Sequence, residues 1–406
     1  MTDNGIKDIE ATIASATTAL SQVSTHSHRR PAILETLAQA HLSLFWRTRV
    51  PADLDRADSF ARQLVEASGK RLGWGTYADV QFERYKLTGL SDNLDTAVSA
   101  YRRAARGVSG ANDPRRAAHL HLVGTSLKAR FERAGIQNDI NEAVHLFRAA
   151  VAATPAGDDD VFVYQASLSS SLHRLYEYTD ELAYLEEAAA LGRQAMAAMP
   201  LDHPSRADCL SSLSFTLRVL FETTGNLSDL EEAVEMAVAG AAGIIPGDSM
   251  APQLAGNLAV VLMIRQERTG ESANTDEAVA LCDQVLASDR ISAVDRLKLL
   301  GLVGAVRMKR FQLFHRPDEL DSGIAAMRAA AASAPAGSGG RHQMLANLGS
   351  GLYTRCRLTG SQADWEESVA SLRQALAEMP ANHAHRNSYQ RNLKVVVSGR
   401  PSTPSA

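Results

Sequence analysis

A 14-residue phrase recurs along this chain at a fixed interval, and that interval limits what the chain can fold into. It reads FERAGIQNDINEAV from Phe131, FETTGNLSDLEEAV from Phe221 and CRLTGSQADWEESV from Cys356. The position before its final valine, Ala143 in the first of these phrases, recurs every 45 residues from there onward. A fixed period of this length is typical of chains that copy and stack one supersecondary unit. Equivalent positions, here called the anchor column, are Ala57, Ala97, Ala143, Ala188, Ala233, Ala278, Gly323 and Ser368.

Each unit is predicted to be a pair of antiparallel helices. Before the anchor, Leu120, Val123 and Leu127 follow the three- and four-residue spacing of one helix face, and Val144 and Phe147 continue it after the anchor. We call the first helix A and the second helix B. A glycine column between them predicts a left-handed helix end: Gly89, Gly135, Gly225, Gly270 and Gly360. An acidic or amide column is expected to cap helix B: Asp53, Asn93, Asp139, Asp229, Asn274 and Asp364.

One column on helix A is small in every unit and predicts close packing between helices: Ala38, Ala78, Gly124, Ser169, Ser214, Ala259, Gly304 and Gly349. The fold class expected is all-α, a right-handed superhelical solenoid of about eight antiparallel helix pairs with an extra helix at each end. A single domain is expected over 1–397, followed by a disordered tail over 398–406. Its parts are a half-repeat 5–25, repeats near 32–70, 72–110, 117–156, 162–201, 207–246, 252–290, 296–336 and 341–380, and a capping helix 385–397.

The order small, aromatic, alanine, bulky, alanine, proline resembles the tetratricopeptide repeat (TPR), with a longer helix A and hinge than its usual period. The stretch NLGSGLYTRCRLTGSQADWEESVASLRQALAEMPANHAHR looks like the 45-residue repeats that precede CHAT-type protease or signalling domains in bacterial and fungal proteins. The resemblance implies a scaffold for protein or peptide partners. No CHAT domain fits within the remaining residues, so the protease activity of the wider family is not carried over.

Composition excludes several classes of protein. The net charge is -4, so a pervasive basic field is absent, and we expect no nucleic-acid partner. The N-terminus lacks a basic start followed by an apolar run, and no long uncharged apolar stretch occurs, so we expect a cytoplasmic protein without a membrane partner. Arginine outnumbers lysine 35 to 7 and alanine is abundant, which favours a GC-rich, bacterial genome. Pairs such as His119 and His121 point apart on a helix, so neither a metal site nor a cofactor is expected.

Charged residues also recur at the repeat period. Two arginine columns and one glutamate column are expected to form ion-pair ladders and packing contacts between neighbouring units. Their members are Arg30, Arg206, Arg296, Arg341 and Arg386; Arg62, Arg102, Arg148, Arg193, Arg328 and Arg373; and Glu132, Glu177, Glu222 and Glu267.

Three columns beside the small column vary between units, and they are predicted to line a concave groove formed by the A helices. The middle units offer cations and the later ones apolar side chains, which would suit a partner with an acidic and an apolar segment. The residues expected to contact it are His121, Lys128, His173, Arg174, Phe215, Arg218, Val260, Met263, Met308 and Tyr353. We therefore expect a non-enzymatic scaffold or adaptor. The alternative is an enzyme or small-molecule sensor with an enclosed pocket that uses His121, His173 and Tyr353.

Overall fold

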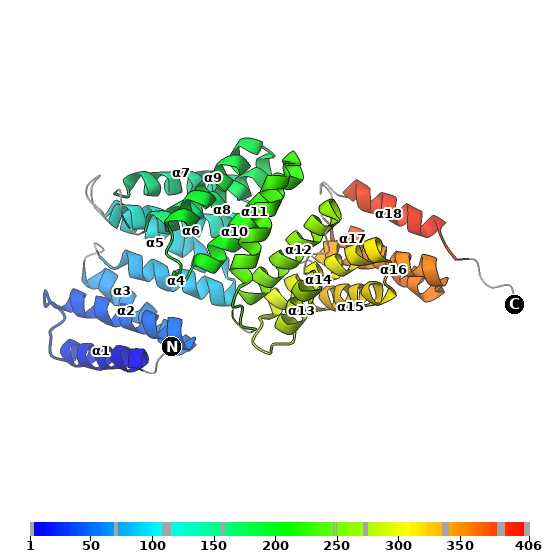
Figure 1. Ribbon diagram of the computed structural model, residues 1–406. Coiled ribbons are helices and arrows are strands. Elements are labelled where there is room, and N and C mark those ends of the chain that lie inside the picture. The colour runs from blue at the N-terminus through cyan, green and yellow to red at the C-terminus, as the bar shows by residue number, and fades with distance from the viewer. Residues whose placement is uncertain are drawn as a thin grey trace. The chain divides into compact units, whose positions relative to one another are not determined.

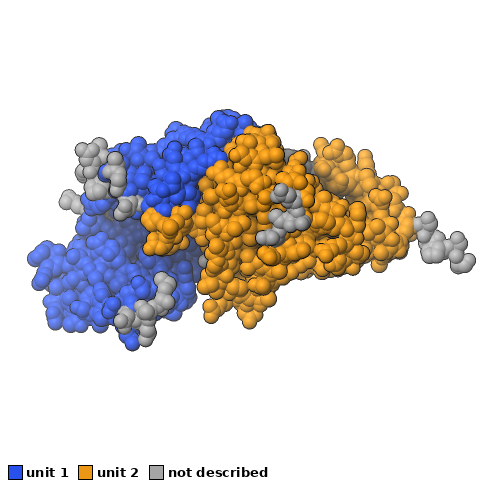
Figure 2. All heavy atoms as spheres, in the orientation of Figure 1, with its two compact units in different colours: residues 1–199 blue, residues 200–406 orange. Residues whose placement is uncertain are grey.

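The chain folds entirely into helices over the residues that its structure describes. The computed structural model describes residues 4–68, 72–107, 115–155, 158, 160–246, 248, 250–270, 275–334, 341–379 and 386–401. Within these ranges there are eighteen α-helices and no β-strand (Figure 1). They divide into two compact units, residues 1–199 and 200–406 (Figure 2). Residues 108–114 and 335–340 lie outside the described ranges, as do residues 402–406 of the tail that was expected to be disordered.

Unit 1 alternates B and A helices along the chain. Its A helices are α2 (Arg30–Thr48), α4 (Trp74–Thr88), α6 (Arg115–Ala134) and α8 (Val161–Thr179). Its B helices are α1 (Asn4–Ser21), α3 (Pro51–Ala67), α5 (Ser91–Arg106), α7 (Gln137–Ala153) and α9 (Leu182–Ala198). Each A helix packs most extensively on the B helix that follows it, and α2 also touches α4 as α6 touches α8.

Unit 2 repeats the arrangement. Its A helices are α10 (Arg206–Thr224), α12 (Ala251–Thr269), α14 (Ala293–Phe314), α16 (Arg341–Thr359) and α18 (Arg386–Ser398). Its B helices are α11 (Leu227–Ala241), α13 (Thr275–Leu286), α15 (Pro317–Ser333) and α17 (Gln362–Glu378). Helices adjacent in sequence pack on each other through both units. The predicted all-α solenoid of stacked helix pairs is confirmed.

The small column marks where helices A and B cross. The Ser169 hydroxyl donates to the Ala188 carbonyl at 2.7 Å, and Ser214 makes the same bond to Ala233 at 2.7 Å. A Cβ placed on Gly124 would lie 2.9 Å from the Phe147 ring, which is closer than carbon atoms approach in folded proteins. Small residues are therefore required at this crossing, as predicted, and the helix backbones approach closely there.

Helix A ends in the left-handed conformation that the glycine column predicted. Gly89, Gly135, Gly225, Gly270 and Gly360 have φ values between 66° and 75°. In the Gly225 example, its N–H donates to the Phe221 carbonyl at 2.7 Å and closes the helix. In repeats without this glycine, Arg49, Asp180 and His315 adopt positive φ at the equivalent end.

The predicted caps of helix B are wrong by three residues. Asp53, Asn93, Asp139, Asp229 and Asp364 each occupy the third residue of their helix, and Asn274 lies outside the described residues. The side chains that accept a backbone N–H at the start of a B helix include those of Asn226 and Ser361. A carboxylate in the first turn still meets free N–H groups and the positive end of the helix dipole. Its position in the hinge also brings it to the preceding helix A.

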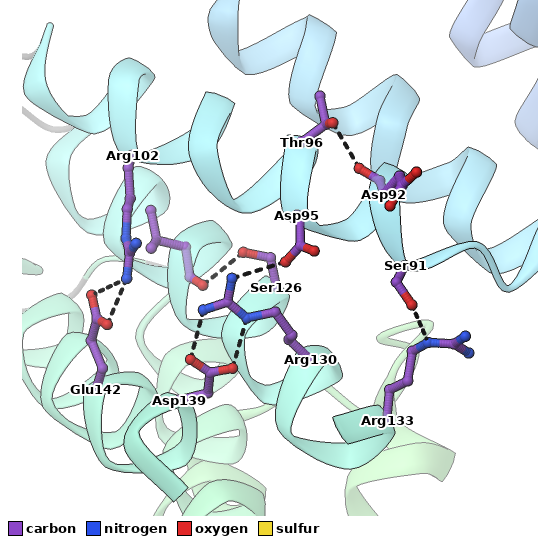
Figure 3. A network of polar contacts seen from close by, with 11 residues as sticks. Ser91, Asp92, Asp95, Thr96, Arg102, Ser126, Arg130, Arg133, Asp139 and Glu142 are labelled. Carbon is purple, nitrogen blue, oxygen red and sulfur yellow. Dashed lines mark hydrogen bonds and ion pairs between the residues drawn. The ribbon is translucent and has the colours of Figure 1, made fainter. Parts of the chain in front are cut away.

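In two repeats, the carboxylate in the first turn of helix B binds an arginine of helix A that lies nine residues earlier in the chain. Arg130 binds Asp139 through two nitrogens, both at 2.7 Å, and reaches Asp95 of the preceding repeat at 3.0 Å (Figure 3). Arg355 repeats the arrangement with Asp364 and Asp321. Each of these arginines therefore ties its own hinge to the preceding B helix.

The expected ion-pair ladder between neighbouring units is confirmed at three positions of one arginine column, whereas Arg62 of that column binds Asp58 within its own helix. Arg102, Arg148 and Arg328 bind the glutamates Glu142, Glu187 and Glu367 of the next B helix, at 2.6, 2.6 and 2.7 Å (Figure 3 shows the first pair). The arginines that open helix A serve packing as well. Arg296, Arg341 and Arg386 donate to the carbonyls of Leu286, Ala331 and Leu376, at the end of the preceding B helix.

The helix α18 packs on the last helix pair of unit 2. The Trp365 indole of α17 donates to the Val396 carbonyl at 2.8 Å, and Tyr389 and Val396 are buried in the apolar core of these repeats. Lys394 of α18 stands where the other A helices carry a small residue. Lys394 is exposed, and so are Val395 and Val397 beside it.

Candidate binding face of the A helices

The predicted groove residues all lie on A helices, and they fall in both units. Unit 1 holds the cationic group and unit 2 the apolar group together with Arg218. In unit 1 they are His121 and Lys128 on α6, with His173 and Arg174 on α8. In unit 2 they are Phe215 and Arg218 on α10, Val260 and Met263 on α12, Met308 on α14 and Tyr353 on α16.

In unit 1 the structure joins α6 and α8 through a row of polar contacts. The Lys128 ammonium donates to the Ser170 hydroxyl at 2.8 Å. Seven residues before Lys128 on α6, Nε2 of His121 shares a hydrogen bond with the Ser167 hydroxyl at 2.8 Å. These side chains are half-buried, and they bond across neighbouring repeats rather than within one. Ser167 was not predicted; it lies two residues before the small position Ser169.

Glutamates neutralise the cations of this row. Lys128 lies 4.0 Å from Glu132, and Arg174 bridges Glu132 at 3.7 Å and Glu177 at 2.7 Å. The glutamate column that was expected to serve packing therefore faces the same surface as the cations. An acidic partner segment would have to exchange with Glu132 and Glu177 for these cations.

Burial and charge set the protonation of two groups on this face. Burial, and to a lesser extent the charge of Lys128, lower the pKa of His121 to about 4, so the ring is neutral at pH 7. Burial alone would raise the pKa of Glu177, but hydrogen bonds from His173 and Arg174 outweigh it and hold the value at about 2. At neutral pH the row therefore offers a neutral imidazole, two hydroxyls and paired charges.

His173 lies deeper than predicted. Its side chain is only 3% exposed and lies between α8 and its neighbours, with Nε2 3.5 Å from Glu177. A partner would reach Arg174, the adjacent residue, before it reached His173. The same offset appears in unit 2, where Met263 is 3% exposed while Ile264 beside it is half-buried.

The apolar residues of unit 2 divide between the surface and the core. Phe215 and Val260 are half-buried, and the Arg218 guanidinium stacks 4.7 Å from the Phe215 ring while it binds Glu222 at 2.5 Å. Met308 and Tyr353 pack against the apolar core of the last repeats. The sulfur of Met308 faces Gly351, and a Cβ on Gly399, just after α18, would overlap the Tyr353 hydroxyl.

Two residues on this side of α14 were missed by the sequence analysis. Leu302 is 40% exposed, and Lys309 binds Glu267 of α12 at 2.7 Å. Leu302 lies two residues before the small position Gly304, and Lys309 five residues after it. Arg174 and Ile264 also lie five residues after their small positions. The repeat spacing could therefore have identified Lys309 as a residue of this face.

The described residues contain no group of three or more His, Cys, Asp and Glu side chains arranged to hold a metal ion. None of the described helices is long and apolar enough to cross a membrane.

Comparison with known proteins places the chain by fold alone. It matches no family model and no curated protein. Among solved structures it is similar to the human IFIT1 dimer with PPP-AAAA, at 12% identity over 90% of this chain and 73% of that one, with a TM-score of 0.51. An IFIT1 monomeric mutant with Gppp-AAAA matches at 14% identity over 90% and 71%, with a TM-score of 0.54.

Proposed function

We propose that this protein is a non-enzymatic cytoplasmic scaffold that binds a segment of a partner protein on the faces of its A helices. It would be a TPR-like protein of the 45-residue variant that resembles the repeats of bacterial and fungal TPR-CHAT proteins. The observation that carries the proposal is the polar row on α6 and α8. Its side chains bond across two repeats at a half-buried surface, whereas the small column of helix A holds Ala, Gly or Ser in every repeat.

The partner segment would have an acidic and an apolar part. Carboxylates of the partner would replace Glu132 and Glu177 as partners of Lys128 and Arg174. In a separate contact on unit 2, apolar side chains of the partner would cover Phe215, Val260 and Leu302. Exchange of one ion pair for another changes affinity little but selects the partner by charge pattern, which suits an adaptor.

The alternative of an enzyme or sensor needs His121, His173 and Tyr353 in one pocket. The two histidines belong to unit 1 and Tyr353 to unit 2, where it packs beside Gly399. Native mass spectrometry of the purified protein tests this alternative, since a small molecule held in a pocket would add its mass to the chain.

The test of the scaffold is a charge reversal at Arg174 with a matched control. Arg174→Glu alters the A-helix face, and Arg148→Glu alters the B-helix ladder; the two side chains are 41% and 43% exposed and each binds a glutamate. A photo-reactive amino acid at Thr125 would cross-link the partner in cells of the native host, and mass spectrometry would map the linked peptide.

We expect Arg174→Glu to abolish the cross-link and Arg148→Glu to leave it at wild-type strength. Equal cross-linking by both variants, with both folded by circular dichroism, would overturn the proposal. Recovery of nuclease-sensitive material in place of a peptide would show that the partner is a nucleic acid.

A further inference from the structure

Three consecutive hinges of unit 1 expose large apolar side chains at the same edge. These hinges join α2 to α3, α4 to α5 and α6 to α7. Trp46, Leu87, Leu90 and Ile136 are each between 44 and 60% exposed. Single exposed apolar residues are common, but a contiguous set on one surface marks an interaction site more often.

The three hinges form one surface because side chains link them. Arg49 at the first hinge lies 3.8 Å from Glu83 of α4. Arg133 at the third donates to the Ser91 hydroxyl of the second at 2.8 Å (Figure 3). We call this region, residues 46–50, 86–91 and 133–136, the hinge surface.

Local structure explains only part of this pattern. An apolar residue directly after a helix-ending glycine often packs back on its own helix, which accounts for Leu90 and Ile136 at these positions. Leu87 lies in the last turn of α4 before the glycine, and Trp46 in the last turns of α2. Neither position has this local role, yet both side chains are about half exposed.

The hinge surface is also basic, although the whole chain carries a net charge of -4. Residues 46–50 and 86–91 contain Arg47, Arg49 and Lys86 and no aspartate or glutamate. The buried Glu83 binds Lys86 at 2.7 Å and lies near Arg49, so it offsets one of the three charges. With Arg133 the surface carries four cations. Against them stand Glu83 and, at its borders, the exposed Glu132 and Asp92, so the balance remains positive by one charge.

We propose that the hinge surface of unit 1 docks an acidic amphipathic helix of a partner protein, at a site separate from the A-helix face. The apolar side of that helix covers Trp46, Leu87 and Leu90, and its carboxylates pair with Arg49, Lys86 and Arg133. Charge complementarity around an apolar centre is the arrangement that selects such a segment.

The probe is a fluorescein-labelled peptide of about 18 residues built from leucine and glutamate with helical spacing, and binding to the full-length protein is followed by fluorescence anisotropy. A scrambled peptide of the same composition tests whether one apolar face is needed. Leu87→Ser with Leu90→Ser removes the apolar centre. The fold should tolerate both changes. Leu87 is half exposed, and Leu90 is the residue before α5, a position where serine is favoured.

We expect the amphipathic peptide to bind and the double variant to bind at least about tenfold more weakly. Lys86→Gln should weaken binding less and reduce its dependence on salt. The matched control is Leu358→Ser in unit 2, two residues before the stop glycine Gly360 as Leu87 is before Gly89, and it should bind like the wild type.

Four results would overturn the proposal. They are no binding of the amphipathic peptide, equal binding of the scrambled peptide, an unchanged affinity in the double variant, and an equal loss in Leu358→Ser. Vesicles of phosphatidylcholine with about 30% phosphatidylserine form a further arm. Their binding in place of the peptide, lost in the double variant, would assign the surface to anionic membranes instead.

Discussion

Single residues decide where each helix of this chain stops and which of its groups are charged. The stop glycines show the first point. Gly225 has a φ of 75°, and a Cβ there would meet nothing within 4 Å, so the position needs glycine for its backbone conformation rather than for space. Gly124 has the opposite reason, since a Cβ would strike Phe147.

We predict that Gly225→Val lowers the free energy of unfolding by about 1 kcal/mol or more, because a β-branched residue is strained at positive φ. The control is Gly75→Ala, at the second residue of α4, where a Cβ also meets nothing but φ is not positive. That change should leave stability equal or raise it by about 0.5–1 kcal/mol. Urea denaturation followed by circular dichroism compares the two, and equal effects would contradict the backbone argument.

The charge state of His121 gives a second prediction at this scale. Its pKa falls from 6.5 to about 4 on folding, mainly through burial. Between these values the unfolded chain binds a proton that the folded chain does not, so stability falls as the pH drops through that window. His121→Gln should remove this part of the pH dependence. Unfolding measured at pH 7 and pH 5 should show a smaller loss in the variant, and an identical loss would place His121 in water.

At the scale of the element, α18 shows how one helix shields the apolar residues of its neighbours from water. It buries Tyr389 and Val396 in the core of the last repeats and accepts the Trp365 indole hydrogen bond. Arg400 stacks over the same indole at 5.1 Å. Without α18, the apolar residues of α16 and α17 that it covers would meet water.

We predict that a chain ending at Met379 aggregates, whereas one ending at Pro401 stays monodisperse. Size-exclusion chromatography with light scattering separates these outcomes. In any soluble fraction of the shorter chain, Trp365 fluorescence should shift to longer wavelength because the indole would become hydrated. A monodisperse shorter chain with unchanged emission would show that α18 does not protect this end.

At the scale of the whole molecule, the repeat made the fold predictable from the sequence. The residues of the binding face were harder to predict. Small, glycine and arginine columns report packing that every unit shares, and the structure confirms them at Ser169, Gly225 and Arg148. The binding face depends on how far each helix is rotated about its axis. One residue of rotation moves Met263 into the core and leaves Ile264 at the surface, and no packing column records that difference. The prediction of the helix B caps was wrong for another reason. In sequence, a hinge carboxylate that binds an arginine such as Arg130 resembles a cap.

The last prediction concerns how far a disturbance spreads through the array. Gly124→Val in unit 1 and Gly349→Val in unit 2 are matched changes, because a Cβ would lie 2.9 Å from Phe147 in one and 2.7 Å from Leu372 in the other. Each repeat contacts mainly its neighbours, so we expect local opening rather than global unfolding. Hydrogen–deuterium exchange with mass spectrometry should show faster exchange in α6 and α7 for the first variant and in α16 and α17 for the second. Faster exchange throughout the chain in either variant would mean that the repeats unfold as one cooperative block, and that the nearest-neighbour contacts do not limit the spread.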